Sequence, residues 1–268
     1  MKYSGKTVII TGASSGIGLA IAELYSNLGA NTVLAARSLD KLQEITRNLP
    51  SPSLAVKCDV ANEEQCKELV SQTVNAFGGV DILVNNAGLS MRALFDDVDI
   101  DVLRKLMEVN FWGTVNCTKY ALPYIQKSKG SIVGISSVAG LHGLPARTGY
   151  SASKYAMHGF LETIRIENLR KDVHVMLVSP GFTESNVRFS ALTSNGEAQG
   201  ESPREEGKMM TAAEVAKFVE RGVRKKKRLM ALDFNGKATI FIKKFWPAML
   251  DRLFYSHMAK EPNSPLAK

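Results

Sequence analysis

Short apolar runs alternate with helix-length amphipathic segments through residues 7–178. The runs are rich in β-branched side chains and carry few polar ones, a pattern typical of strands buried on both faces of a parallel sheet. We expect strands at Thr7–Ile10, Thr32–Ala35, Leu54–Lys57, Ile82–Val84, Ile132–Ile135 and Val173–Val178, with Leu229–Leu232 as a candidate last strand. Helices are expected near 16–28, 39–48, 63–77, 100–127 and 151–171. This alternation predicts an α/β protein with right-handed crossovers and one doubly wound parallel sheet.

Length and charge limit the class of protein further. The chain has 268 residues, 45% of them hydrophobic, which is enough for one large domain with a sizeable core. Residues 224–268 hold 11 Lys and Arg against 3 Asp and Glu, whereas residues 1–223 hold 23 of each sign. The net charge of +8 therefore belongs to the C-terminal tail. For this reason we do not expect the domain as a whole to bind nucleic acid.

The chain is expected to divide into a domain over 1–235 and a basic, amphipathic C-terminal extension over 236–268. Residues 186–210 contain Ser, Asn, Gly and Pro without helical or strand periodicity. Such a segment is either a mobile lid over an active site or a plain disordered insert.

Targeting and cysteine signals favour a cytoplasmic protein. The first six residues lead almost directly into an apolar run, which leaves no room for a signal peptide. Apolar stretches stay below the roughly 18 residues that a membrane span needs. Cys58, Cys66 and Cys117 are irregularly spaced, so we expect buried thiols in a reducing compartment, with no disulfide and no metal site.

A glycine-rich turn follows the first expected strand and precedes a helix. Its glycines are spaced Gly-x-x-x-Gly-x-Gly. Glycine permits close backbone approach to a ligand, and a helix N-terminus presents free N–H groups to a phosphate. The turn is therefore either purely structural or the pyrophosphate site of a Rossmann domain. In the second case the contacts come from Gly12, Ser14, Ser15, Gly16, Ile17 and Gly18.

Arg37 stands at the end of the second strand, where an NAD-binding protein usually has an acid. A carboxylate would repel a 2′-phosphate, whereas a guanidinium can bind it bidentately. With help from Ser14 or Ser15, Arg37 favours NADP(H) as the cofactor. The alternative is an ordinary surface arginine.

Four further motifs follow in a fixed order. They are Asn85-Asn86-Ala87-Gly88 after the fourth strand, Asn110 in a long helix, Ser136-Ser137 after the fifth strand, and Tyr150-Ser151-Ala152-Ser153-Lys154 opening the next helix. Together with the glycine spacing, this set resembles the short-chain dehydrogenase/reductase family over roughly residues 5–185. The resemblance implies a single Rossmann domain and an oxidoreductase that moves a hydride between NADP(H) and a carbonyl or secondary alcohol.

The resemblance implies four catalytic residues: Tyr150 as acid/base, Ser137 holding the substrate oxygen, Lys154 binding the nicotinamide ribose, and Asn110 holding a water that links Lys154 to solvent. A reacting carbonyl oxygen gains negative charge and needs a proton donor. A free phenol has a pKa near 10, too high for a good base at neutral pH. Lys154 lies one helical turn from Tyr150, so its ammonium is expected to lower the phenol pKa by about 1–3 units.

The resemblance also implies further cofactor contacts. They comprise Asp59 and Val60 beside the adenine, Asn86, Ala87 and Gly88 beside the ribose, and Tyr150, Lys154, Pro180, Gly181 and Thr183 toward the nicotinamide. Ser185 occupies the family's usual threonine position, so the hydroxyl that reaches the carboxamide stays open between Thr183 and Ser185.

The walls of the reaction site are expected from 89–96, 138–148 and 182–210, which are mostly apolar. We expect Ser137, Leu144, Tyr150 and Phe182 to contact the substrate, and the substrate to be hydrophobic. His142 and His158 are expected to be packed or solvent-facing side chains rather than catalytic ones.

The tail contains Arg224–Arg228 and then apolar residues at helical spacing, with Pro247 expected to start a new helix. A basic amphipathic helix with Trp and Phe is typical of peripheral contact with an anionic membrane. The alternatives are packing over the substrate pocket or against a second subunit.

Two other functions are possible for this sequence. A non-catalytic nucleotide sensor or scaffold would use the same fold, but the intact Ser137, Tyr150 and Lys154 argue against it. A sugar-nucleotide epimerase or dehydratase would need a larger C-terminal domain. By family analogy, we expect a homodimer or homotetramer.

Overall fold

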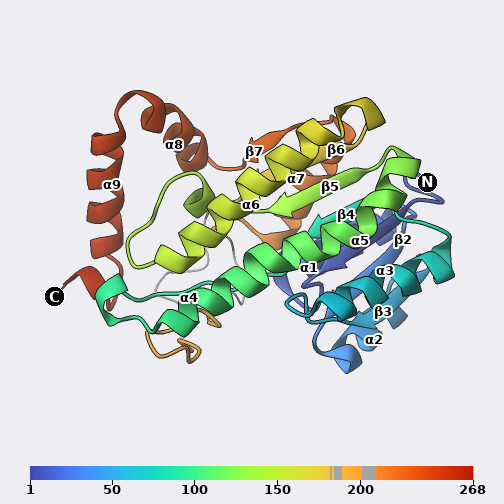
Figure 1. Cartoon of the computed structure of the whole chain (residues 1–268), viewed down its shortest axis with the longest axis horizontal. Helices are drawn as coiled ribbons and strands as arrows, with labels where there is room; N and C mark the ends of the chain where they lie inside the picture. The colour runs from blue at the N-terminus through green and yellow to red at the C-terminus, as the bar shows by residue number, and fades with distance from the viewer. Residues whose placement is uncertain (182, 184–188, 201–208, 268) are drawn as a thin grey trace.

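The computed structural model describes residues 1–181, 183, 189–200 and 209–267 (Figure 1). Its described residues form a seven-stranded parallel sheet in the order β3-β2-β1-β4-β5-β6-β7. The strands are β1 (Thr7–Thr11), β2 (Asn31–Ala36), β3 (Ser53–Lys57), β4 (Ile82–Asn85), β5 (Ser131–Ile135), β6 (His174–Ser179) and β7 (Leu229–Ala231). The expected doubly wound Rossmann fold is confirmed, and each expected strand lies within one residue of its predicted bounds.

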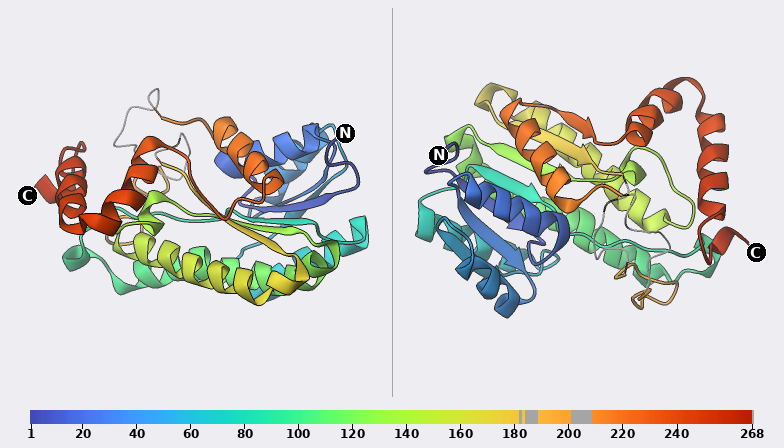
Figure 2. Two further views of the ribbon diagram at one scale, coloured as in Figure 1. Left: turned by 90° about the horizontal axis from the view of Figure 1, so that it is seen from above. Right: turned by 180° about the vertical axis from the view of Figure 1, so that it is seen from behind.

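Helices cover both faces of the sheet, as the left view of Figure 2 shows. One face packs on α1 (Gly16–Asn27), α2 (Leu39–Arg47) and α7 (Ala212–Arg224). The other packs on α3 (Glu63–Phe77), α5 (Gly113–Ser128) and α6 (Thr148–Glu167). Because both faces are covered, the central strands are buried along their whole length, which explains their apolar sequences.

The helix expected over 100–127 is not one regular helix. It consists of α4 (Ile100–Met107), a π-helical turn at Glu108–Trp112, and α5. The apolar periodicity continues through the turn, so the sequence pattern did not reveal it. The α6 helix begins at Thr148, three residues before the predicted start, and α7 was not predicted.

Part of the segment expected to be a lid is tied to the fold. Leu192 N donates to Ser90 O at 2.9 Å, and Arg92 N donates to Leu192 O at 2.8 Å. Leu192 itself belongs to a buried cluster with Met91 and Leu106. Residues 189–200 are therefore anchored beside the chain that leaves β4. Residues 186–188 and 201–208 of the expected lid lie outside the described residues.

The chain after β7 forms α8 (Phe234–Phe245) and α9 (Pro247–Ala259), which stand at one end of the molecule (Figures 1 and 2). Pro247 occupies the first turn of α9, as predicted. The α9 helix packs on the loop between β5 and α6, where His142 stacks on Phe254 with ring centroids 5.2 Å apart. No helix in the described part of the chain is long and apolar enough to cross a membrane.

Candidate active site

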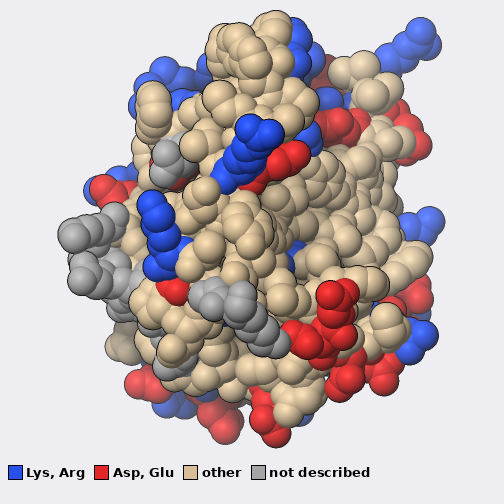
Figure 3. Space-filling view, turned by 90° about the vertical axis from the view of Figure 1, so that its left-hand side faces the viewer, with Lys and Arg blue, Asp and Glu red and all other residues tan. Residues whose placement is uncertain are grey.

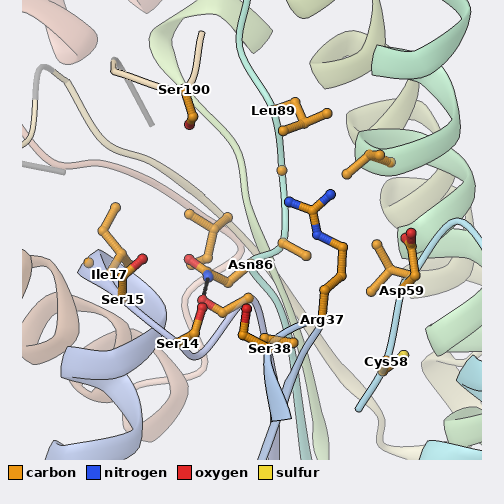
Figure 4. A pocket seen from close by; sticks show the side chains of 18 of the residues that line it. Ser14, Ser15, Ile17, Arg37, Ser38, Cys58, Asp59, Asn86, Leu89 and Ser190 are labelled. Carbon is orange, nitrogen blue, oxygen red and sulfur yellow. Dashed lines mark hydrogen bonds between the residues drawn. The ribbon is translucent and has the colours of Figure 1, made fainter. Parts of the chain in front are cut away.

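A crevice of about 320 Å³ opens at the carboxyl ends of β1, β2, β4 and β5 (Figure 4). The strand order reverses between β1 and β4, and such a switch point is where ligands bind in open α/β sheets. Thirteen of the residues predicted to hold the cofactor line this crevice. They are Gly12, Ser14, Ser15, Gly16, Ile17, Arg37, Asp59, Val60, Asn86, Ala87, Gly88, Tyr150 and Lys154.

The glycine turn is shaped by its contact with Asn86. The Asn86 side chain donates to Thr11 O at 2.9 Å and to Gly12 O at 3.2 Å. A Cβ at Gly18 would lie 2.4 Å from Gly12 O and 2.5 Å from Asn86 Nδ2, so only glycine fits. Gly12 has a φ of 66°. Gly18 therefore supports the turn from behind and lies outside the crevice lining.

The N-terminus of α1 opens onto this turn. Ser15 is its N-cap, and its side chain makes no capping hydrogen bond within the described structure. The described first turn, which starts at Gly16, holds no acidic side chain. The first N–H groups of a helix have no partner within the helix, and they attract anions. The backbone here thus fits the pyrophosphate of a dinucleotide, and the contacts predicted from the glycine spacing stay a prediction.

Arg37 and Asp59 line the next part of the crevice. Figure 4 shows the Arg37 side chain extending from the end of β2 into the cavity, with Ser38 at its base and Asp59 to one side. The Asp59 Oδ1 atom accepts from Ala61 N at 3.1 Å. The Arg37 guanidinium therefore lies at the edge of the crevice, where the end of β2 meets the glycine turn. Ser38 is a lining residue that the sequence reasoning missed, although it directly follows Arg37.

Tyr150 and Lys154 line the other end of the crevice, and Ser137 lies beside Tyr150 although it is not part of the lining. Ser137 follows β5 in an extended conformation, and its hydroxyl accepts from Ala139 N at 3.2 Å. The Ser137 hydroxyl lies close enough to the Tyr150 phenol to lower its pKa. The Lys154 Nζ atom lies 5.7 Å from the Tyr150 ring centroid and donates to Ile135 O at 2.9 Å. The predicted constellation is therefore assembled, with a backbone carbonyl of β5 fixing the lysine.

The pKa of Tyr150 does not follow our expectation. Burial raises the pKa of the phenol above its usual value, and this effect exceeds the lowering by the Ser137 hydroxyl and the Arg147 charge. The expected lowering by Lys154 is not among the causes that set this pKa. The same burial lowers the pKa of the Lys154 amine to about 8. Arg147 lies three residues before Tyr150 but belongs to no sequence motif, so nothing in the sequence indicated that it acts on the phenol.

Asn110 lies in the π-helical turn and is fully buried. Its Oδ1 atom accepts from Leu89 N at 2.7 Å, and its Nδ2 donates to Leu89 O at 2.9 Å and to Ser153 Oγ at 2.8 Å. The side chain thus connects the chain after β4 to α6. A Cβ at Gly88 would lie 3.1 Å from Asn110 Oδ1 and 3.5 Å from Lys154 Nζ, so both groups meet at Gly88. The water expected at Asn110 stays a prediction.

Several predicted residues lie away from the crevice. Pro180, Gly181 and Thr183 are not among its lining; Pro180 O accepts from Val138 N, and Thr183 Oγ1 donates to Gly181 O. Leu144 lines a second cavity, between the β5–α6 loop and α9. Phe182 and Ser185 lie outside the described residues.

The two histidines near the site are packed, as expected. His158 Nε2 lies 2.7 Å from Ser136 Oγ, and burial lowers its pKa to about 4. His142 Nε2 lies 3.0 Å from Asp251 Oδ1 on α9. All three cysteines are buried and free, also as expected.

Eight residues of the lining were not among the predicted site residues, although Leu89 and Ser190 lie in segments expected to wall the site. Six of the eight directly adjoin a predicted residue, so extending each motif by one position would have found them. Ile135 and Ser190 are the exceptions, because neither adjoins a predicted residue in the sequence. The eight are Ala36, Ser38, Cys58, Leu89, Val109, Ile135, Ser136 and Ser190.

Comparisons with known proteins agree with this geometry. The family model described as short chain dehydrogenase matches residues 6–195. Among curated proteins, the mouse (Mus musculus) dehydrogenase/reductase SDR family member 7B is 35% identical over 266 residues, covering 96% of this chain and 82% of the mouse protein. The 11-beta-hydroxysteroid dehydrogenase A of Sesamum indicum is 36% identical over 272 residues, covering 98% of this chain and 78% of its own.

Solved structures show the same architecture. An alcohol dehydrogenase from the archaeon Thermococcus sibiricus, complexed with 5-hydroxy-NADP, superposes with a TM-score of 0.71 at 26% identity, covering 85% of this chain and 94% of that one. A short chain dehydrogenase/reductase from Burkholderia phymatum in complex with NAD reaches a TM-score of 0.81 at 24% identity, covering 93% and 96%. At 24% identity, the second structure shows a likeness of the fold alone.

Proposed function

The chain belongs to the short-chain dehydrogenase/reductase family of oxidoreductases, and from that premise we propose that it uses NADP(H) to interconvert a hydrophobic carbonyl compound and its secondary alcohol. The observation that carries the proposal is the placement of Tyr150 and Lys154, with Ser137 beside the phenol, at one end of a crevice whose other end is a glycine-lined helix N-terminus. When bound, the nicotinamide cofactor supplies the hydride in reduction or accepts it in oxidation.

Tyr150 donates the proton that neutralises the substrate oxygen during reduction and removes it during oxidation. Its raised pKa keeps the phenol protonated at neutral pH, which is the form that reduction needs. Ser137 lies beside the phenol, so its hydroxyl can hold a carbonyl oxygen next to the same proton.

Lys154 supplies a positive charge that favours the phenolate left after proton transfer. With a pKa of about 8, the amine is largely protonated at neutral pH. Its hydrogen bond to Ile135 O fixes it between β5 and α6, leaving other N–H groups of the ammonium for a ribose hydroxyl.

The choice of NADP(H) rests on Arg37. No acidic residue stands at the end of β2, where Ala36, Arg37 and Ser38 line the described crevice. A guanidinium and an adjacent hydroxyl can hold a 2′-phosphate by charge-assisted hydrogen bonds. Arg37→Asp should weaken NADPH binding by at least tenfold and leave NADH binding little changed. Arg47→Asp, on the exposed end of α2, is the matched control; equal losses for both cofactors would exclude the phosphate contact.

The hydrophobic substrate class is supported by Leu89 in the crevice lining and by Met91 and Leu192 in the buried cluster beside it. The name of the Sesamum indicum relative, a hydroxysteroid dehydrogenase, also supports a hydrophobic alcohol.

The test is an NADPH-consumption screen over hydrophobic ketones and aldehydes, with Tyr150→Phe in parallel. We expect turnover by the native chain, and for Tyr150→Phe a loss of at least a hundredfold in kcat with cofactor affinity retained. A native chain that binds NADPH but reduces no carbonyl would instead favour a nucleotide sensor. Undiminished activity of Tyr150→Phe would remove the acid/base assignment.

A further inference from the structure

Exposed apolar side chains are concentrated in α8 and α9. Of 17 large hydrophobic residues exposed in the described structure, eight lie between Phe234 and Tyr255. Five of them, which we call the α8–α9 outer face, surround the corner between the two helices: Phe241, Phe245, Trp246, Met249 and Leu253. Single exposed apolar residues are common, but a gathered set indicates an interaction surface.

The aromatic part of the outer face is continuous. Ring centroids of Phe241 and Phe245 lie 5.2 Å apart, and those of Phe245 and Trp246 lie 5.8 Å apart. Even within this cluster, Phe241, Phe245 and Trp246 remain 60%, 53% and 55% exposed. The rings therefore contact each other but do not bury each other.

The α9 helix packs on the domain through a different row of residues. Leu250 and Met258 are buried, and Phe254 between them stacks on His142 of the β5–α6 loop. Met249 and Leu253 lie on the neighbouring row and stay exposed. The outer face is thus a second apolar row, left over after the helix has packed on the domain.

Positive charge is concentrated in the two helices that carry this face. Residues 234–260 hold five cationic side chains, Lys237, Lys243, Lys244, Arg252 and Lys260, against the single acid Asp251. Asp251 lies 3.0 Å from His142, and Lys243 Nζ donates to Leu141 O at 2.7 Å. This acid and this lysine therefore both contact the β5–α6 loop, whereas in the described structure the other four cations are not held there. Lys244 Nζ lies 5.4 Å from the Phe245 ring centroid, so the charge reaches the aromatic cluster itself. Figure 3 looks onto this end of the molecule, and its upper part is largely uncharged, with Lys and Arg beside it.

We propose that the α8–α9 outer face binds the surface of an anionic lipid bilayer, with its aromatic rings in the headgroup region and its lysines on the lipid charges. Aromatic and basic residues together are the composition of interfacial helices. A second copy of the chain is disfavoured as the occupant, because a two-fold contact would bring like charges together. The helices have 12 and 13 residues, about 18–20 Å, and a bilayer core is about 30 Å thick. They therefore lie along the surface.

Co-sedimentation of the full chain with vesicles tests the proposal independently of the enzymatic reaction. We expect binding to vesicles of phosphatidylcholine mixed with phosphatidylserine, weaker binding to phosphatidylcholine alone, and a loss of affinity in high salt. Phe245→Ser/Trp246→Ser and Lys237→Glu/Lys244→Glu should each reduce partitioning by at least tenfold. Ile166→Ser/Leu169→Ser and Lys171→Glu/Lys217→Glu, which change exposed residues elsewhere, should leave it unchanged.

A spectroscopic measurement covers the case in which a double variant fails to fold. The chain has two tryptophans, so in a Trp112→Phe background Trp246 alone reports fluorescence. Its emission should shift to shorter wavelength with phosphatidylserine vesicles. No shift, equal binding to both vesicle types, or self-association that Phe245→Ser/Trp246→Ser abolishes would each overturn the proposal; the last would assign the face to a second copy.

Discussion

Arg92 and Glu261 form a buried ion pair that holds the C-terminal segment on the chain leaving β4. Arg92 Nη2 lies 3.6 Å from Glu261 Oε2, and each side chain is 5% exposed. Arg92 Nη2 also donates to Pro262 O at 2.6 Å. Arg147 Nη2 approaches the same carboxylate at 3.9 Å. The buried Arg92 and the partly buried Arg147 therefore both approach one carboxylate.

Glu261→Gln keeps the volume of this side chain and removes its charge. At 3.6 Å and an effective dielectric constant of about 20, the Coulomb energy of the Arg92 pair is about 5 kcal/mol. Leaving one partner of a buried pair uncompensated typically costs about 3–5 kcal/mol. In a domain of this size each kcal/mol lowers Tm by about 2–4 °C, so we expect a fall of about 6–20 °C.

Thermal unfolding followed by circular dichroism measures this change. Glu64→Gln is the control, because Glu64 also contacts a cation, Lys67 at 3.0 Å, but its side chain is 77% exposed. An exposed pair contributes about 0–1 kcal/mol, so Tm should fall by less than about 4 °C. Arg92→Met/Glu261→Leu should be more stable than Glu261→Gln, since no buried charge loses its partner. If Glu261→Gln behaves like Glu64→Gln, the pair does not hold the C-terminal segment.

Three further outcomes are expected. First, the pKa of His158 is about 4 when folded against 6.5 ordinarily, so stability falls as pH drops from 6.5 to 4, by up to about 3 kcal/mol. Denaturant unfolding of His158→Gln should show a flatter pH dependence, and an unchanged slope would contradict this. Second, Gly18→Ala should weaken NADPH binding at least tenfold in a fluorescence titration, while Gly159→Ala, with no described atom within 4 Å of its Cβ, should not. Third, Arg147 lowers the Tyr150 pKa, so Arg147→Met should move the pH profile of alcohol oxidation to higher pH; an unmoved profile would exclude this role.

Local sequence patterns predicted the central part of the fold well. The strands β1 to β6 and the glycine turn have local signals, β-branched runs and fixed spacings, so each could be found without tertiary information. The α7 helix also has a local signal, a capping box between Thr211 and Glu214, which the adjoining irregular segment obscured.

Features that depend on distant contacts could not be predicted in this way. Arg92 and Glu261 are far apart in the sequence, and neither lies in a motif. The raised pKa of Tyr150 depends on burial by the assembled fold rather than on the spacing to Lys154. Leu144 was expected to contact the substrate, but the position of α9 places it in a separate cavity.

The residue proposed to select the cofactor and the residues proposed to transfer the proton lie after different strands of the sheet. Arg37 stands after β2, whereas Ser137 and Tyr150 stand after β5 and on α6, with β1 and β4 between them. Under the proposed function, a substitution after β2 would therefore leave Ser137, Tyr150 and Lys154 in place. Cofactor preference would then be able to change during evolution through one or two positions near Arg37, independently of the groups proposed for proton transfer.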